Sequence, residues 1–158
     1  LLRDTGAPLA PFNAWQIIQG LETVGLRMKQ HCSNAEKVVT FLETQKKVQN
    51  VIYPTNHQGE IKERAKKYMQ GGYGSLVGMD VGTKENGAKF IDNLKMLYHV
   101  ANIGDARSLA IHPATTTHSQ LNEKELLAAG VTPGYVRLSI GIEHPDDIIA
   151  DIKQALAA

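Results

Sequence analysis

YVRLSIGIEHPDDIIADI, residues 135–152, contains a strand pattern followed at once by a helix pattern. Val136, Leu138 and Ile140 alternate with polar side chains, and strict alternation is typical of a strand that buries one face. Pro145, followed by two aspartates, suits the first turn of a helix, where the macrodipole favours negative charge. The segment therefore predicts a sheet packed against helices, with the polar side of the strand facing away from them.

Outside this segment, short β-forming runs bounded by glycine or proline predict further strands. These runs are residues 48–53, 75–81, 98–101 and 109–111. The last two are expected to flank a tight turn at Gly104-Asp105. The whole pattern indicates an α/β protein in the broad sense, with about four strands and roughly five or six helices.

The first third of the chain predicts two helices. After Pro11, apolar residues recur at spacings of three and four, so a helix is expected over about residues 11–31, largely covered by other parts of the protein. Ser33 followed by Glu36 is a capping box, which predicts that a second helix begins at Asn34. Two later helices have capping side chains of their own, at Thr83 and Asn122.

Composition places the chain among ordinary globular domains. Of its 158 residues, 42% are hydrophobic and 21% charged, which excludes disordered and low-complexity classes. A formal net charge of +1 gives no reason to expect nucleic-acid or membrane binding. The single cysteine, Cys32, fits a reducing compartment, so a cytoplasmic protein is expected. Because the first residue is Leu1 rather than Met, the sequence resembles part of a longer protein.

Arg137 is the most informative candidate for a binding residue. It projects from the polar side of its predicted strand, together with Tyr135 and Ser139. A guanidinium held on a rigid strand and aimed away from its own core suits bidentate capture of a carboxylate or phosphate. The alternative is an ordinary surface arginine, or one that pairs with Glu143.

Two loops carry the remaining candidates. In residues 102–109, Gly104 permits a turn that leaves backbone N–H groups free for a ligand, and Asn102 adds an amide; the alternative is a plain hairpin turn. His112 and His118 are six residues apart, but no Cys, Asp or Glu lies nearby to complete a zinc site. No metal is therefore expected, and hydrogen bonds from these side chains to loop backbone are favoured.

Three motifs in this order resemble one enzyme family. They are Gly104-Asp105-x-x-Ser108-Leu109, then His112-Pro113-Ala114 with Thr117-His118, then Val136-Arg137-Leu138-Ser139-Ile140-Gly141-Ile142-Glu143. Two earlier segments also match, Gly6-x-Pro8-x-x-Pro11-Phe12-x-Ala14-Trp15 and Gly20-Leu21-Glu22-Thr23. Over essentially its whole length, the chain thus resembles the C-terminal part of the cysteine/methionine-metabolism enzymes that use pyridoxal phosphate.

The resemblance implies a fold and a domain organisation. Residues 1–158 would be the single C-terminal domain of a fold-type I pyridoxal-phosphate enzyme, an α+β sandwich whose small, mostly antiparallel sheet has helices on one face. A long linking helix, about residues 11–31, would begin this domain. The larger upstream domain would hold the pyridoxal phosphate and its Schiff-base lysine, so no cofactor is expected on this fragment alone.

The resemblance also assigns roles to particular residues. Arg137 would bind the α-carboxylate of the amino-acid substrate, with help from the backbone or amide of Asn102. Ile103 would lie against the substrate pocket. Supporting residues would hold the loop and the arginine in place; these are Thr117, His118 and Glu143.

Within the family, Asn102 favours the sulfhydrylase branch, because cystathionine-handling relatives commonly carry serine there. The full-length transferase of methionine biosynthesis would make L-homocysteine and acetate from O-acetyl-L-homoserine and sulfide, whereas the fragment alone would be inactive. Methionine γ-lyase and the cystathionine γ-synthases and lyases remain alternatives, as does a non-catalytic binding or assembly module. The resemblance further implies a homotetramer for the full-length protein.

Overall fold

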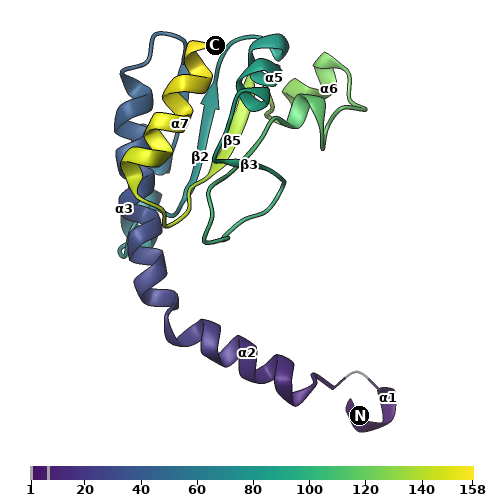
Figure 1. Ribbon diagram of the computed structural model, residues 1–158. Helices are drawn as coiled ribbons and strands as arrows, with labels where there is room; N and C mark the ends of the chain where they lie inside the picture. Colours follow the sequence, from purple (N-terminus) through teal and green to yellow (C-terminus); the bar gives the residue numbers. More distant parts are fainter. Residues whose placement is uncertain (1, 7) are drawn as a thin grey trace.

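The computed structural model describes residues 2–6 and 8–158, and these form one five-stranded sheet in the order β1-β2-β5-β4-β3 (Figure 1). The strands are β1 (Asn50–Ile52), β2 (Leu76–Asp80), β3 (Tyr98–His99), β4 (Leu109–Ile111) and β5 (Tyr135–Ser139). Neighbouring strands are antiparallel except β3 and β4, which are parallel. The expected hairpin at Gly104 is therefore wrong, because parallel neighbours cannot be joined by a tight turn. Residues 100–108 form instead a longer connection, called here the 100–108 loop.

The helices are α1 (Leu2–Thr5), α2 (Pro11–Glu22), α3 (Val24–Glu43), α4 (Gly59–Tyr68), α5 (Lys84–Asp92), α6 (Glu123–Ala128) and α7 (Pro145–Ala157), with 3-10 turns at Pro54–Asn56 and Pro113–Thr115. Helices α3, α5 and α7 pack on one face of the sheet. Figure 1 shows α3 and α7 side by side across the same face of the strands. Fully buried side chains of the sheet, such as Val77 and Leu138, share one core with Leu42 of α3 and Ile148 of α7. The α/β fold with helices on one face is thus confirmed, with five strands among the described residues where about four were expected.

The helix boundary near residue 33 is not where the capping box indicated. The break falls at Thr23, whose ψ of 3° is not helical, and α3 then runs without interruption past Ser33. Asn34, Ala35 and Val38 are buried in the body of the protein. Their packing stabilises a continuous helix at a position where the local sequence alone favours a helix start. The other two predicted caps are confirmed, since Thr83 accepts from the N–H of Asn86 and Asn122 forms a complete capping box.

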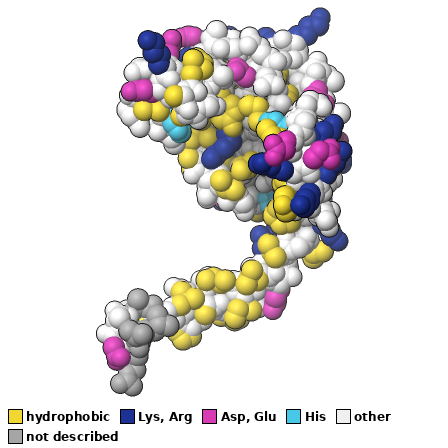
Figure 2. All heavy atoms as spheres, turned by 180° about the vertical axis from the view of Figure 1, so that it is seen from behind, with side chains coloured by type: hydrophobic (Ala, Val, Ile, Leu, Met, Phe, Trp, Pro, Cys, Tyr) yellow, Lys and Arg dark blue, Asp and Glu magenta, His cyan; other side chains and the backbone are white. Residues whose placement is uncertain are grey.

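Helix α2 projects from the body as an arm, together with α1 (Figure 1). No residue of α2 is buried against the rest of the described chain, so the expectation that this helix is largely covered is not met by these residues. Its apolar side chains are about half exposed, for example Trp15 and Ile18 at 54% each. Figure 2 shows hydrophobic side chains along much of this arm. Among the described residues, no helix is long and apolar enough to cross a membrane.

Candidate functional site

Arg137 lies in the middle of the sheet, on strand β5 between β2 and β4. In the strand register it is opposite Gly78 on one side and Ile111 on the other. Its strand neighbours Val136 and Leu138 are fully buried in the core that the helices cover. Successive side chains of a strand point to opposite faces, so the half-buried Arg137 projects from the face that the helices leave open. Figure 2 shows this side of the molecule, where hydrophobic side chains gather.

Tyr135 shares this open face and forms one wall beside Arg137. Its ring lies over Gly78, since a Cβ atom placed on Gly78 would fall 2.7 Å from the ring. The absence of a side chain at Gly78 therefore makes room for the tyrosine. Burial raises the pKa of the Tyr135 phenol, and the positive charge of Arg137 opposes that rise only in part. The phenol is thus neutral at ordinary pH and does not compensate the guanidinium charge.

The 100–108 loop approaches Arg137 from the β4 side. Nη2 of Arg137 donates a long hydrogen bond of 3.4 Å to the backbone oxygen of Asn102. The Asn102 side-chain oxygen accepts from the N–H of Ile103 at 2.9 Å, so it shapes the loop rather than facing the arginine. Ile103 itself is 57% exposed. The structure therefore brings Asn102 to Arg137, while most of the five guanidinium donors have no hydrogen-bond partner among the described residues.

Glu143 does not pair with Arg137 among the described residues, which contradicts the alternative of a simple surface ion pair. One carboxylate oxygen accepts from the backbone N–H of Ser108 at 2.6 Å, and the other accepts from the Ser108 hydroxyl at 2.9 Å. The Ser108 Oγ in turn accepts from the N–H of Gly141 at 2.8 Å. The carboxylate is thus committed to the end of the 100–108 loop.

Helix α3 holds the other side of the 140–143 segment, which follows β5. Nδ2 of Asn34 donates to the backbone oxygens of Gly141 and Glu143, at 3.0 and 2.8 Å. Nδ1 of His31 lies 2.6 Å from the backbone oxygen of Ile140. Both side chains are almost fully buried. Sequence reasoning missed His31, Asn34 and Ser108, although Ser108 stands inside one of the quoted motifs and Asn34 is a polar residue on the apolar side of its helix.

Thr117 and His118 lie in the segment after the 3-10 turn at 113–115. Oγ1 of Thr117 and Nδ1 of His118 are 2.9 Å apart, and the N–H of His118 donates to the backbone oxygen of Pro113. In the described part of the chain, no hydrogen bond links either side chain to Arg137 or to the 100–108 loop, so their supporting role rests on the resemblance alone. The described residues also contain no cluster of His, Cys, Asp or Glu able to hold a metal ion.

His112 is buried, as the sequence favoured, with both ring nitrogens hydrogen-bonded. Nε2 lies 2.8 Å from the backbone oxygen of Pro133, and Nδ1 lies 2.9 Å from the hydroxyl of Thr115. Burial lowers the pKa of the imidazole. The absence of a side chain at Gly87 lets the ring pack against α5, because a Cβ atom there would overlap the ring. His112 is therefore part of the structure around the site rather than a free acid or base.

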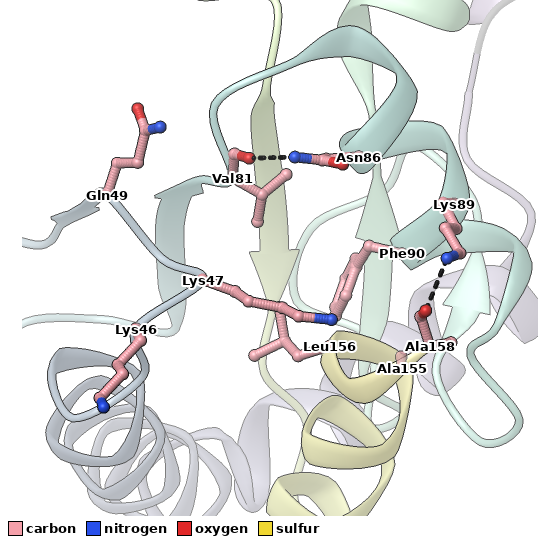
Figure 3. Close-up of a pocket in the computed structure, with 10 residues that line it drawn as sticks. All are labelled: Lys46, Lys47, Gln49, Val81, Asn86, Lys89, Phe90, Ala155, Leu156 and Ala158. Atoms are coloured by element: carbon pink, nitrogen blue, oxygen red, sulfur yellow. Dashed lines mark hydrogen bonds between the residues drawn. The ribbon is translucent and has the colours of Figure 1, made fainter.

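A pocket of about 290 Å³ opens elsewhere, between the C-terminal ends of α3 and α7 and helix α5 (Figure 3). Neither Arg137 nor Asn102 lines it. Its polar groups are largely engaged within the chain, because Asn86 donates to the backbone of Val81 and Lys89 donates to the backbone of Ala158. Lys47 also lines the pocket and donates to the backbone oxygen of Ala157. The open face around Arg137 is accordingly the better candidate for a functional site.

Comparison with known proteins identifies the family. The model of the family described as Cys/Met metabolism PLP-dependent enzyme matches residues 1–157. An O-acetyl-L-homoserine sulfhydrylase of Leptospira meyeri is 52% identical over 157 residues, covering 98% of this chain and 36% of its own length. A homocysteine synthase of Schizosaccharomyces pombe is 44% identical over 156 residues, with the same coverage.

A solved structure extends the likeness to three dimensions. The crystal structure of an O-acetylhomoserine (thiol)-lyase of Campylobacter jejuni, which holds N'-pyridoxyl-lysine-5'-monophosphate, superposes with a TM-score of 0.89 and 45% identity. The superposed region covers 99% of this chain and 38% of the Campylobacter jejuni chain. The present chain thus spans little more than a third of the length of these relatives. From the match over residues 1–157 and the shared fold, the chain belongs to the Cys/Met metabolism PLP-dependent enzyme family.

Proposed function

We propose that this chain is the C-terminal, substrate-carboxylate-binding domain of a pyridoxal-phosphate-dependent sulfhydrylase. The whole protein would convert O-acetyl-L-homoserine and sulfide into L-homocysteine and acetate. The single observation that carries the proposal is the position of Arg137, which projects from the open face of the sheet with most of its donors unused by residues 2–6 and 8–158. The names of relatives that are 44–52% identical support the choice of reaction.

The chemistry of the site fits an amino-acid carboxylate. A guanidinium can donate two parallel hydrogen bonds to one carboxylate, which fixes both the position and the orientation of the substrate. Tyr135 stays neutral beside it and Glu143 is bound to Ser108, so neither competes for the positive charge. Holding the carboxylate also limits rotation about the substrate's Cα, which is the geometric condition for breaking a bond at that carbon.

Asn102 and Ile103 would complete the mouth of the site. The backbone oxygen of Asn102 bonds to the guanidinium, and the Asn102 side chain stabilises the turn that presents Ile103. The exposed Ile103 side chain gives an apolar contact for the methylene groups of a substrate such as O-acetylhomoserine. Methionine γ-lyase and the cystathionine γ-synthases and lyases could use Arg137 in the same manner, so the substrate must be tested directly.

The cofactor would be held by the upstream part of the protein. The contribution of Arg137 and the 100–108 loop would be capture of the substrate. The apolar arm α2 supports a contact with that upstream part, since the relatives are nearly three times as long and exposed tryptophan, phenylalanine and isoleucine side chains favour burial. Phe12 and Trp15 would be central to this contact.

The test uses the full-length protein that contains this chain. We expect activity with O-acetyl-L-homoserine plus sulfide to exceed activity with L-methionine or L-cystathionine. Arg137→Lys keeps the charge but loses the bidentate geometry, and we expect kcat/KM to fall by about tenfold to a hundredfold. Near-normal kcat/KM in both Arg137→Lys and Arg137→Ala would contradict the assignment of Arg137. A preference for methionine or cystathionine would instead overturn the choice of reaction.

A further inference from the structure

We infer that Ser108 and Asn34 are positioning residues for the carboxylate site, and that they act by fixing the 100–108 loop relative to Arg137. The inference rests on the proposed function, because it concerns the same site. It assigns roles to two side chains that lie outside that site and do not contact Arg137 through any hydrogen bond of the described chain. The two act on opposite sides of the 140–143 segment.

The first step concerns how the 100–108 loop is attached. Near its N-terminal end the N–H of Val100 donates to the backbone oxygen of Ala110 at 3.2 Å, and further attachments lie near its C-terminal end. Residues 101–104 are exposed, and Gly104 has a φ of 81°, in the left-handed region that glycine adopts readily. Near the end of the loop, the backbone oxygen of Ala106 accepts from the N–H of Ile142 at 2.8 Å. Both the backbone and the hydroxyl of Ser108 then bond to Glu143. The position of Asn102 above Arg137 therefore depends on these attachments.

The second step concerns how closely the loop and the 140–143 segment pack. A Cβ atom placed on Gly141 would overlap the Glu143 carboxylate and the backbone of Ala106 and Arg107. The Ser108 hydroxyl lies in this contact, where it accepts from Gly141 and donates to Glu143. Ser108 is fully buried, so its loss would leave a carboxylate oxygen and a backbone N–H short of a partner in a region that water reaches poorly.

The third step links this contact to helix α3. Asn34 is fully buried and donates to the backbone oxygens of Gly141 and Glu143, while its own oxygen accepts from the side chain of Gln30 at 2.8 Å. Asn34 thus holds the 140–143 segment from the side opposite the loop. An aspartate has the same shape, but it would place an anionic oxygen where the Asn34 amide nitrogen donates. That oxygen would repel the two backbone oxygens. Asn34→Asp is therefore expected to release the segment and, with it, the loop.

Asn102, the loop residue that contacts Arg137, would lie at the carboxylate end of the bound amino acid. Displacement of the loop should therefore act on this end more than on the methylene groups that Ile103 would contact. Binding of a ligand that carries the α-carboxylate should weaken, whereas binding of the same ligand without it should change little. L-Homoserine and 3-aminopropan-1-ol form such a pair, since the second is the first without its carboxylate. A general loss of stability would lower the amount of active enzyme but would leave the ratio of the two inhibition constants unchanged.

The experiment measures both inhibition constants in the full-length enzyme, with O-acetyl-L-homoserine and sulfide as substrates. In Ser108→Ala and Asn34→Asp we expect the inhibition constant of L-homoserine to rise about tenfold and that of 3-aminopropan-1-ol to stay within about twofold. KM for O-acetyl-L-homoserine should rise more than kcat falls. Ser139→Ala is the matched control, because Ser139 is a buried serine on the face of Arg137 whose hydroxyl has no hydrogen-bond partner among the described residues.

The outcomes separate this inference from the proposed function. If Arg137→Ala abolishes the preference for L-homoserine but Ser108→Ala and Asn34→Asp both keep the wild-type ratio, Arg137 retains its role and the positioning role is wrong. A selective effect of equal size in Ser139→Ala would also overturn the positioning role. If Arg137→Ala itself keeps the wild-type ratio of the two inhibition constants, the proposed carboxylate site is wrong, and the positioning role is wrong with it. Amide hydrogen exchange of residues 101–107 should rise in Ser108→Ala and not in Ser139→Ala.

Discussion

Replacing Asp151 with asparagine is expected to destabilise the protein far more than the loss of one charge would suggest. Asp151 lies on α7 and is only 6% exposed. One carboxylate oxygen accepts from the backbone N–H of Lys95 at 2.9 Å and from Nε2 of Gln154 at 2.9 Å. The other accepts from the N–H groups of Met96 and Leu97, at 2.8 and 3.0 Å. The carboxylate thus ties the segment that enters β3 to the C-terminal helix.

The size of the effect follows from this arrangement. In asparagine, the amide oxygen can replace only one of the two carboxylate oxygens, and the amide NH2 group takes the place of the other. Because each carboxylate oxygen accepts from two N–H donors, the NH2 group faces two donors whichever way the amide is turned. Two charge-assisted hydrogen bonds are lost, and the free energy of unfolding should fall by about 2–4 kcal/mol at pH 7. For a chain of this size, the corresponding fall in melting temperature is roughly 5–15 °C.

The pH dependence gives a second measurement with a definite sign. Burial alone would raise the pKa of Asp151, but the hydrogen bonds from Leu97, Met96, Lys95 and Gln154 outweigh it and lower the pKa. The folded protein therefore holds the carboxylate ionised under conditions where the unfolded chain takes up a proton. The stabilisation is present above the unfolded pKa of ~3.9 and is lost as the pH falls through the lower folded pKa.

Urea denaturation followed by circular dichroism should be carried out on the wild type and Asp151→Asn between pH 7 and pH 3. The difference in free energy of unfolding should be largest at neutral pH and shrink in acid. Asp147→Asn is the matched control, because Asp147 is exposed in the first turn of the same helix and should contribute less than about 1 kcal/mol. A small loss for Asp151→Asn at pH 7, or a loss independent of pH, would refute the reasoning.

Two further predictions concern the core and a buried base. Leu42→Ala removes a fully buried side chain of α3 and should cost about 2–5 kcal/mol, whereas Leu127→Ala, at a side chain 58% exposed, should cost less than about 0.5 kcal/mol; equal costs in urea denaturation would contradict the assigned core. Because burial lowers the pKa of His112, the unfolded chain binds a proton before the folded protein does, and stability should fall as the pH drops below about 6.5. His112→Gln should flatten this dependence between about pH 7 and pH 5, and an unchanged slope would show that another group is responsible.

Local sequence patterns predicted the elements whose signals agree with their packing. The alternation in β5 identified both the buried face and the direction of Arg137, because a strand has a period of two. Thr83 and Asn122 cap helices as expected, since the contacts that define a cap lie within three residues. Ser33 and Glu36 carry the same kind of signal but lie inside α3, where buried neighbours favour a continuous helix.

Other features depend on contacts between residues that are distant in the sequence. The parallel pairing of β3 and β4 joins two very short strands, and neither run of residues indicates its partner or direction. For the candidate site, the strand alternation predicted that Arg137 projects away from the core, but the hydrogen bonds of Asn34 reach across more than 100 residues to Gly141 and Glu143. A single polar residue within an apolar helix pattern does not reveal such a partner.

The order of the strands has a consequence for synthesis on the ribosome. The middle strand, β5, lies between β2 and β4 although it is made after both. While residues 50–111 emerge, β2 and β4 lack the neighbour that joins them, and their apolar side chains have no complete core to enter. The sheet can close only after Ser139 has left the exit tunnel, so this region cannot complete its fold before β5 is made, and a stall before β5 would leave a nascent chain prone to aggregation.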